Sequence, residues 1–511
     1  MKLKDYLLIS LFTFISPLIY GYYFGILDHH HSLPYINKLL NPNLYLNDYY
    51  FSQPQPQYSI FNYLIVGLKK ITQLSLPWTH FLLYLITLWL LLYSIYKLAL
   101  VIYKNKNISL LSVSFFFLPK WAAQIGYLTH QFYFVTRDLS LAVSILALIS
   151  ILNRRILSPI FLLIFAFIVN PLIPIPVGIF FLIQLIKLKN HHYFLSFVWI
   201  DILKKRGTYS FPHLWLWTGW GNFILFLSLL AASFYYFKNK LFNNLTKPLF
   251  KFIAVCIFLF LFQTIIGLIP VPFLIQFQFL RAINFIFILS LISFSALIIK
   301  LLSSQRLLIK LLAVLAALAV YFWSFHLTIW HFLIIWSLFL VLIIYQKKLL
   351  LTSKRLFLTP LIIGLLLIQV FLKVIVNPPK INLPFYIHYS NPLVDLSDYQ
   401  GWFDLQIWAR DNTLVTATFL TPPQKSGFRT FSLRSIIVDT KDGGNIFYSS
   451  SYAGEWDQRI KDLADFNNFS EANFFRLKNK YAFDYLVVPE IFPVLDFNQV
   501  YRQKGFVVYQ L

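Results

Sequence analysis

The sequence has little of several residue types, and each scarcity excludes a class of protein. A single cysteine, Cys256, lies within an apolar run, so neither a disulfide framework nor a thiolate metal site can be built. Acidic side chains are also scarce: 19 Asp and Glu stand among 511 residues. No Walker loop, G-x-G-x-x-G or C-x-x-C motif occurs, which leaves energy coupling by a bound nucleotide without support.

Apolar side chains, in contrast, are abundant. The chain is 59% hydrophobic and 19% aromatic, with a mean hydropathy of +0.68, whereas a soluble domain is about 45–50% apolar. A membrane span needs about 20 mostly apolar residues, and such runs recur from residue 6 to residue 376. We therefore predict a polytopic α-helical membrane protein with about 11–12 transmembrane helices. The first run follows Lys2 and Lys4 and is expected to be a retained helix, not a cleavable signal.

The expected spans are separated by short loops. They are residues 6–27, 77–103, 108–128, 132–152, 155–188, 219–238, 250–269, 280–301, 307–325, 327–346 and 356–376. The run 155–188 is too long for one straight span, and the phrase N-P-L-I-P-I-P interrupts it. We expect a crossing followed by a half-helix that bends at the prolines.

The Lys and Arg residues give a formal net charge of +24 and gather in these loops. In a soluble chain such a charge would suggest nucleic acid, but here we interpret it as topology signals and contact with anionic lipids. Nucleic acid is not an expected partner. Because basic loops stay in the cytoplasm, counting the crossings places residues 28–76 and the chain after residue 376 outside.

The external loop 28–76 opens with Asp28 and three histidines, His29, His30 and His31, and later carries Asp48. A partly desolvated carboxylate at a membrane boundary can act as a base for an incoming hydroxyl, so Asp28 and Asp48 are candidate catalytic residues. Both may equally be read as solvated interfacial acids. Consecutive histidines point in different directions, so at most two of them, or one with Asp28, could hold a divalent metal ion.

Further polar residues lie near the expected outer ends of spans. Arg281 begins the span 280–301, where a guanidinium could clamp a lipid phosphate or simply reach the interface. His191 and His192 form a second histidine pair that could face the same cavity. Arg137 and Asp138 are expected to form an internal ion pair. Within 28–76, residues 34–40 predict a short amphipathic helix in the membrane interface.

The composition changes after residue 376, and most of the acidic residues follow. This divides the chain into a transmembrane domain, 1–376, and a small extracytoplasmic α/β domain, 377–511. We predict helices at 402–410 and 455–465 and strands at 415–420, 434–439, 484–489 and 506–511. A polar turn that includes Gly427 and Arg429 could bind a ligand, although ordinary strand–loop chemistry explains it nearly as well.

These features together resemble the GT-C class of polytopic glycosyltransferases. The phrase GYYFGILDHHHSLPYINKLLNPNLYLNDYYF is similar to the first loop of uncharacterised bacterial membrane proteins of this type. The phrases NHHYF, EWDQRIKDL, FDYLVV and WARDNTLVTATFLTPPQKSGFRTFSLRSIIVDTKDG resemble later parts of the same proteins. The usual Asp-Glu pair of GT-C enzymes is absent, because His29 follows Asp28.

The resemblance implies a multi-pass protein of the bacterial cytoplasmic membrane that transfers a sugar from a polyprenyl-phosphate-linked donor at the outer face. Asp28 or Asp48 would act on the acceptor and Arg281 would contact the donor phosphate. Two alternatives stay open: a lipid-linked glycan transporter or polymerase in which these residues line a route, and a scaffold that displays the tail. Membrane lipids and the lipid-linked sugar are the expected partners.

Overall fold

The computed structural model describes residues 3–51, 60–120, 128–183, 197–237, 246–268, 272–304, 307–322, 380–381, 387–388, 399–447 and 449–511. The chain forms two compact units. The helical unit comprises Met1–Tyr22, His80–Phe194 and Thr208–Tyr389. The second unit, which we call the loop–tail unit, combines Tyr23–Thr79, Leu195–Gly207 and Ser390–Leu511.

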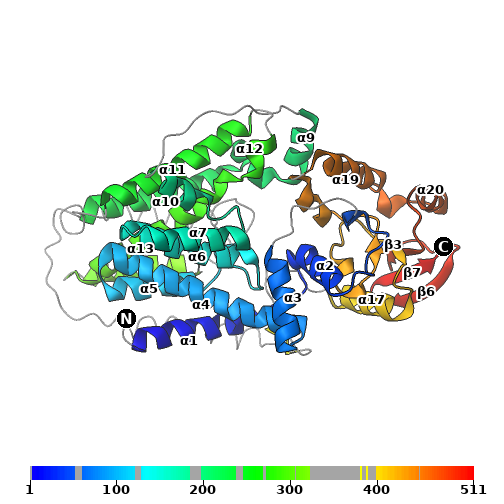
Figure 1. The fold of residues 1–511 in the computed structure, drawn as a ribbon, viewed down its shortest axis with the longest axis horizontal. Helices are drawn as coiled ribbons and strands as arrows, with labels where there is room; N and C mark the ends of the chain where they lie inside the picture. Colours follow the sequence, from blue (N-terminus) through cyan, green and yellow to red (C-terminus); the bar gives the residue numbers. More distant parts are fainter. Residues whose placement is uncertain are drawn as a thin grey trace. The chain divides into compact units, whose positions relative to one another are not determined.

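Helices make up nearly all of the described part of the helical unit (Figure 1). Its α-helices are α1 (Leu3–Tyr20), α4 (Leu76–Tyr103, whose first turn falls in the loop–tail unit), α5 (Lys106–Phe116), α6 (Thr136–Leu152), α7 (Leu157–Val169), α8 (Ile175–Ile183), α10 (Trp217–Phe237), α11 (Thr246–Ile266), α12 (Pro272–Gln276), α13 (Ile283–Leu302) and α14 (Leu307–Phe322). Short pieces complete it: the 3₁₀ helices η2 (Thr208–Ser210), η3 (Pro212–Leu214) and η4 (Phe279–Ala282), and the antiparallel strands β1 (Lys380–Ile381) and β2 (Ile387–His388).

Three described segments are long and apolar enough to cross a membrane: Leu76–Tyr103, Lys247–Ile266 and Leu274–Leu302. Three shorter apolar helices lie at Leu157–Val169, Gly219–Phe234 and Ile309–Leu318. The protein is therefore mostly helical, with three candidate membrane spans among the described residues.

Several expected spans need correction. The first helix ends at Tyr20 and not at residue 27, because Gly21 takes a left-handed conformation (φ +81°). In the run 108–128, α5 ends at Phe116, and residues 121–127 lie outside the described residues. The break in 155–188 is confirmed, since α7 ends at Val169 and α8 begins at Ile175. The expected spans 327–346 and 356–376 lie outside the described residues.

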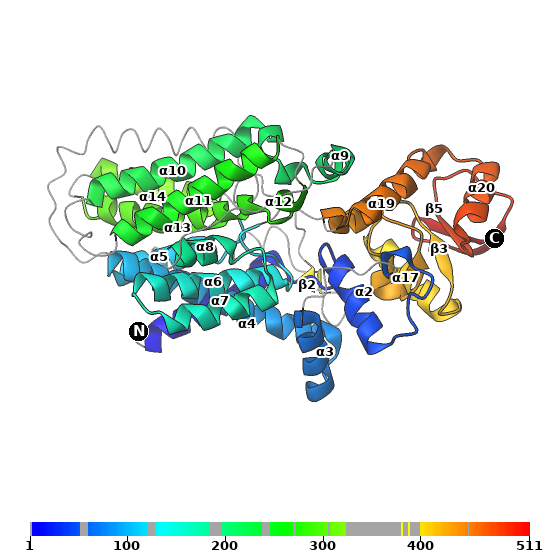
Figure 2. The ribbon, with the colours of Figure 1, turned by 45° about the horizontal axis from the view of Figure 1, so that its top comes forward.

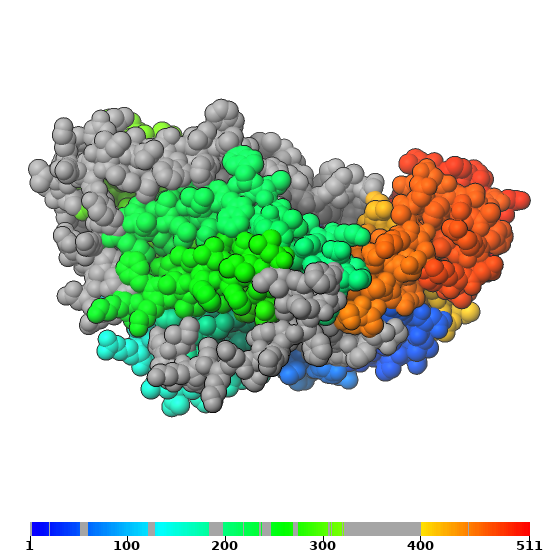
Figure 3. Space-filling view, turned by 90° about the horizontal axis from the view of Figure 1, so that it is seen from above, coloured from blue at the N-terminus to red at the C-terminus, as the bar shows by residue number. Residues whose placement is uncertain are grey.

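Hydroxyl side chains join the helices of this unit. The Tyr103 hydroxyl on α4 lies 2.7 Å from the Ser233 hydroxyl on α10 and donates to Ser293 on α13 at 3.0 Å. Ser290 on α13 donates to the carbonyl of Phe226 on α10 at 2.8 Å. In a bilayer the hydrophobic effect does not drive helices together, so interhelical hydrogen bonds of this kind contribute to their association. In Figures 2 and 3, α10 and α11 lie side by side on one face of the unit.

Apolar side chains also cover the outside of the helical unit. On α1, Leu7, Leu11, Phe14 and Leu18 are exposed at helical spacing. On α7 the same holds for Phe161, Ile164, Phe165 and Ile168. A face of this kind is unfavourable in water and suits lipid.

The loop–tail unit contains a five-stranded mixed sheet in the order β4-β3-β5-β7-β6. Its strands are β3 (Thr418–Leu420), β4 (Ser435–Ile436), β5 (Tyr485–Pro489), β6 (Asn498–Gln503) and β7 (Phe506–Gln510). β3 pairs in parallel with β4 and β5, while β5, β7 and β6 pair antiparallel. The sequence predicted four of these strands, and β6 was missed because its residues are mostly exposed and polar.

The same unit also contains helices. They are α2 (His29–Leu40), α3 (Ile60–Thr72), α9 (Phe197–Arg206), α17 (Tyr399–Asn412), α18 (Phe428–Ser432), α19 (Ser450–Asp462) and α20 (Glu471–Tyr481), with the 3₁₀ helices η1 (Tyr49–Phe51), η6 (Lys441–Phe447) and η7 (Phe466–Asn468). The predicted helices 402–410 and 455–465 correspond to α17 and α19. Trp402, Leu405 and Ala409 of α17 enter the core beside Phe419 and Val508 of the sheet. The small C-terminal α/β domain is thus present.

The external loop joins this domain to form one unit. The predicted helix at 34–40 is α2, but its apolar residues Leu33, Tyr35 and Ile36 are buried within the unit. Much of the apolar side of α2 is therefore packed against protein within the unit. The helix α3 was not foreseen.

Two helical glycines in the loop–tail unit test how tightly α17 packs. A Cβ at Gly401 of α17 would lie 2.2 Å from the carbonyl oxygen of Lys504, whereas a Cβ at Gly454 of α19 would meet nothing within 4 Å. We expect Gly401→Ala to destabilise the protein, because a backbone atom must move. Gly454→Ala should stabilise it by about 0.5–1 kcal/mol, since alanine favours helix. Chemical denaturation of both variants measures the difference, and equal shifts would contradict this packing.

Candidate functional site

The polar cluster that joins the external loop to the tail is the candidate site. Two hydroxyl groups of the loop donate hydrogen bonds to backbone carbonyls of the tail. The Tyr45 hydroxyl donates to the carbonyl of Arg429 at 2.9 Å, and the Tyr49 hydroxyl donates to the carbonyl of Tyr452 at 2.8 Å. All of these residues lie in the loop–tail unit. The loop is therefore held by specific contacts to segments almost 400 residues later in the chain.

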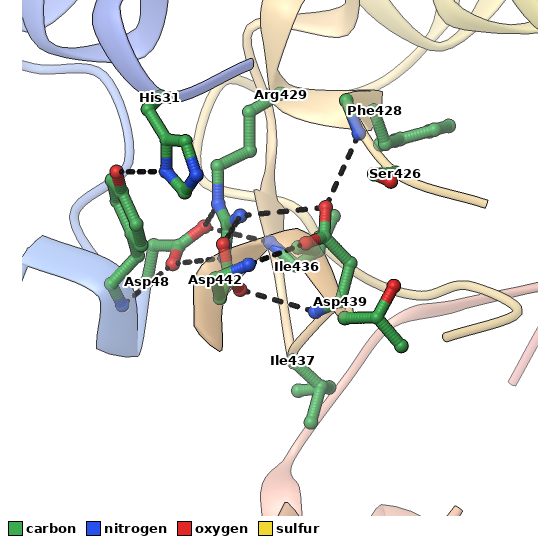
Figure 4. A network of polar contacts seen from close by, with 12 residues as sticks. His31, Asp48, Ser426, Phe428, Arg429, Ile436, Ile437, Asp439 and Asp442 are labelled. Carbon is green, nitrogen blue, oxygen red and sulfur yellow. Dashed lines mark hydrogen bonds and ion pairs between the residues drawn. The ribbon is translucent and has the colours of Figure 1, made fainter. Parts of the chain in front are cut away.

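Arg429 is the centre of this cluster (Figure 4). Its side chain is only 3% exposed. Towards Asp48, Nε donates at 2.6 Å and Nη2 at 2.9 Å; towards Asp442, Nη1 donates at 2.8 Å and Nη2 at 3.0 Å. One guanidinium thus forms two bidentate ion pairs, a geometry that only arginine supplies. Arg429 is the second residue of α18, and the residue before this helix, Gly427, takes a left-handed conformation (φ +86°).

Asp48 is fully enclosed in this network. Besides Arg429, its carboxylate accepts hydrogen bonds from the backbone N–H groups of Tyr50 and Ile436, both at 2.9 Å. Four N–H donors therefore occupy its two oxygens, and its side chain is 0% exposed. These contacts make Asp48 an anchor between the loop and β4.

Two further carboxylates complete the cluster. Asp439 accepts a hydrogen bond from the Gly427 N–H at 3.2 Å, and the backbone N–H of Asp442 donates to it at 2.9 Å. Asp439 lies 4.0 Å from Nη1 of Arg429. Three carboxylates thus share one guanidinium. Burial raises the pKa of Asp442 to about 7, Arg429 offsets this in part, and Asp439 raises it further.

Asp28 differs from Asp48 in being accessible. It directly precedes α2, its side chain is 36% exposed, and Nζ of Lys441 in η6 lies 3.0 Å from its Oδ1. A carboxylate with about a third of its side chain exposed can be reached from outside the unit. Of the two predicted acids, Asp28 is therefore the one that a substrate could reach.

The three histidines face three different neighbours, as consecutive residues of a helix do. His29 accepts a hydrogen bond at Nδ1 from the Gly25 N–H at 2.9 Å. The His31 Nδ1 lies 2.9 Å from the Tyr50 hydroxyl. The His30 ring packs against Gly427, where a Cβ would come within 2.3 Å of its Nε2.

The charge state of two of these rings follows from their surroundings. Burial and, to a smaller extent, the positive charge of Lys441 together lower the pKa of His30 to about 3. The same two causes hold the pKa of His31 well below its ordinary value. Both rings are therefore neutral at pH 7 and can serve as hydrogen-bonding groups beside Asp28.

Arg281 belongs to the helical unit. It lies in η4, where its Nε donates to the side-chain oxygen of Gln278 at 2.8 Å. Gln278 itself is buried and left-handed (φ +45°). Elsewhere in this unit the expected Arg137–Asp138 pair is confirmed, with Nε and Oδ1 3.8 Å apart. The structure brings Asp28, His29, His30, His31 and Asp48 into one unit and places Arg281 in the other.

A divalent metal was the other expectation for this region. Within the described ranges, no three His, Cys, Asp or Glu side chains gather as ligands of one ion. His191 and His192 lie outside the described residues. We route no chemical step through a metal.

Sequence reasoning missed the partners of the two acids. Arg429 stood in a segment singled out as a ligand-binding turn, but its pairing with Asp48 could not be foreseen, because 381 residues separate them. Lys441 and Asp442, in the phrase V-D-T-K-D-G-G, received no role. The available signal was that phrase itself, in which two acids, one lysine and two glycines occur together.

Comparison with known proteins adds one finding. Residues 400–463 match the model of a family described as Domain of unknown function (DUF6798). The match includes Arg429, Asp439 and Asp442, and excludes Asp48. No curated protein matches the chain.

Removing one member of the buried pair tests the anchor. We expect Asp48→Asn to lower the free energy of unfolding by about 3–5 kcal/mol, because Arg429 loses half of its charge compensation inside the protein. The matched control is Asp411→Asn, whose partner Arg410 lies at the surface; such pairs contribute about 0–1 kcal/mol. Unfolding in denaturant, followed by tryptophan fluorescence, measures both. Equal losses would show that Asp48 is no anchor.

The raised pKa of Asp442 makes the free energy of unfolding of the protein depend on pH. Folded Asp442 keeps its proton up to about pH 7, whereas the unfolded side chain releases it near 3.8, so the folded state binds more protons between these values. The contribution of Asp442 to stability is therefore full below about pH 4 and is lost as the pH rises to 7. The slope is at most about 1.4 kcal/mol per pH unit.

The comparison with Asp442→Asn isolates this contribution. Asparagine does not titrate, and the two histidines affect both proteins alike. We expect the stability of the unmodified protein, measured relative to Asp442→Asn, to fall between about pH 4 and 7. A constant difference across this range would mean that Asp442 is ionised throughout.

Proposed function

We propose that this protein is a membrane glycosyltransferase that moves a sugar from a polyprenyl-phosphate-linked donor to an acceptor at the outer face of the bacterial cytoplasmic membrane. The proposal includes a GT-C-like arrangement of about 11–12 transmembrane helices and an extracytoplasmic tail. The observation that carries it is Asp28, a half-exposed carboxylate beside a cation and two neutral imidazoles.

Sugar transfer from a polyprenyl phosphate requires few catalytic groups from the protein. The acceptor O–H gives its proton to the Asp28 carboxylate while its oxygen attacks the anomeric carbon of the sugar. The bond from that carbon to the phosphate oxygen breaks, and polyprenyl phosphate leaves with the bonding electrons. Attack from the opposite side inverts the anomeric configuration. One base and cationic stabilisation of the phosphate are sufficient for this displacement.

The side chains near Asp28 support this assignment. Lys441 contacts the carboxylate at 3.0 Å, and the neutral His30 and His31 offer hydrogen bonds to an acceptor without adding positive charge. Asp48 is less suited to act on the acceptor, since four donors already occupy its oxygens. Of the two acids, we therefore assign the base to Asp28.

Arg281 is the proposed contact to the donor phosphate. A guanidinium binds phosphate oxygens in pairs. Gln278 orients it by accepting from both Nε and Nη2. The candidate membrane spans supply a setting in which a polyprenyl chain dissolves.

The alternative is a lipid-linked glycan transporter or polymerase without this transferase chemistry. In that case the same polar side chains would line a route through the membrane. The two functions differ in their products. A transferase releases free polyprenyl phosphate, and a transporter leaves the lipid-linked sugar intact.

Asp28→Asn tests the proposed base. Purified protein in nanodiscs, supplied with radiolabelled polyprenyl-phosphate sugars and a mixture of acceptors, should release polyprenyl phosphate. We expect Asp28→Asn to lower this rate by about 10²–10⁴-fold, the usual contribution of a general base. Asp411→Asn removes another exposed, ion-paired aspartate of the same unit and should retain the full rate.

Two outcomes would go against the proposal. Full turnover by Asp28→Asn would remove Asp28 from the mechanism. Intact lipid-linked sugar after incubation with the unmodified protein, combined with movement of that lipid between leaflets, would favour the transporter.

A further inference from the structure

The helix α3 is apolar on two opposite faces. Phe61, Ile65 and Val66 are buried, and α3 packs on α2. The opposite face is exposed and carries five large side chains. They are Ile60 (58% exposed), Tyr63 (51%), Leu64 (45%), Leu68 (38%) and Ile71 (81%). Their spacing of three and four residues puts them on one side of the helix.

A helix of this kind is not suited to water on its outer side. Scattered exposed apolar residues are normal, but a continuous stripe indicates contact with something apolar. Within the stripe, Gly67 leaves open space, since a Cβ there would meet nothing within 4 Å. The loop–tail unit has thus already used one face of α3 for its own packing and leaves the other for a partner.

We infer that the exposed face of α3 rests in the surface layer of a lipid bilayer and that Lys69 and Lys70 contact anionic headgroups. The inference concerns where this helix lies and does not depend on glycosyl transfer. It replaces α2, whose apolar face is largely buried, as the interfacial element of the external loop.

The continuity of the chain identifies lipid as the partner. α3 ends at Thr72, and α4, a candidate membrane span, begins at Leu76. The few residues between them reach about 14 Å at most, so α3 must lie near the membrane surface wherever α4 enters it. With 13 residues, α3 is about 20 Å long and cannot cross a hydrocarbon core of about 30 Å.

Charge supports the same partner. The α3 sequence IFNYLIVGLKKIT contains no acidic residue, and both of its charged side chains, Lys69 and Lys70, stand in the last turn next to the link to α4. Lysines beside an apolar face are typical of helices that bind anionic bilayers. A neutral protein partner would not explain their position.

This placement has a consequence for the candidate site. α3 packs on α2, and Asp28 directly precedes α2. A lipid-bound α3 would therefore fix the height of Asp28 and the histidines above the membrane surface.

Fluorescent labels on α3 test the inference in the full-length protein. Leu64→Cys and Leu68→Cys, each in a Cys256→Ala background, are labelled with bimane and reconstituted into nanodiscs. We expect lipids brominated just below the headgroups to cause a loss of emission at both positions, while aqueous iodide causes none. Gln458→Cys on the exposed side of α19 is the matched control and should respond to iodide.

Other results would overturn the inference. Quenching by iodide and not by bromolipid at positions 64 and 68 would place this face in water. Disulfide-linked dimers formed through these cysteines would assign the face to a second copy of the chain. The variant Lys69→Gln/Lys70→Gln should lose the increase in bromolipid quenching that phosphatidylglycerol brings over phosphatidylcholine alone. An unchanged increase would exclude the lysines from the contact.

Discussion

The structure of the loop–tail unit depends on the ion pair between Arg429 and Asp48. Each of these charges would be costly to bury alone, and each is satisfied only when the external loop and the tail are both in place. Arg429 belongs to α18, and Asp48 directly precedes η1, so the pair fixes two segments that are distant in sequence. The contacts of Tyr45, Tyr49 and α2 with the tail rely on the same alignment.

This network separates the roles of two acids that looked equivalent in the sequence. Asp48 is enclosed by four donors, while the side chain of Asp28 is 36% exposed and contacts Lys441. Their difference arises from packing against Arg429 and Lys441. The histidines that follow Asp28 contact three separate neighbours.

Local sequence patterns allowed many of the helices and strands to be predicted. Short apolar runs located β5 and β7, and the interruption at the prolines located the break between α7 and α8. What could not be predicted depends on distant contacts. The grouping of the external loop with the tail rests on pairings such as Asp48–Arg429, which leave no periodic signal. Helix α3 was missed because its apolar residues stand on two faces and so show no simple amphipathic pattern.

The separation of 381 residues between Asp48 and Arg429 also bears on how the protein is made. Synthesis runs from the N-terminus, so the loop emerges long before its partner exists. Closing so long a loop is slow, and its contacts form only after the chain between them has been inserted. During this interval the Asp48 carboxylate must stay hydrated, and the apolar residues of α2 are not yet packed against the tail. The loop–tail unit is therefore completed only after the tail has been synthesised.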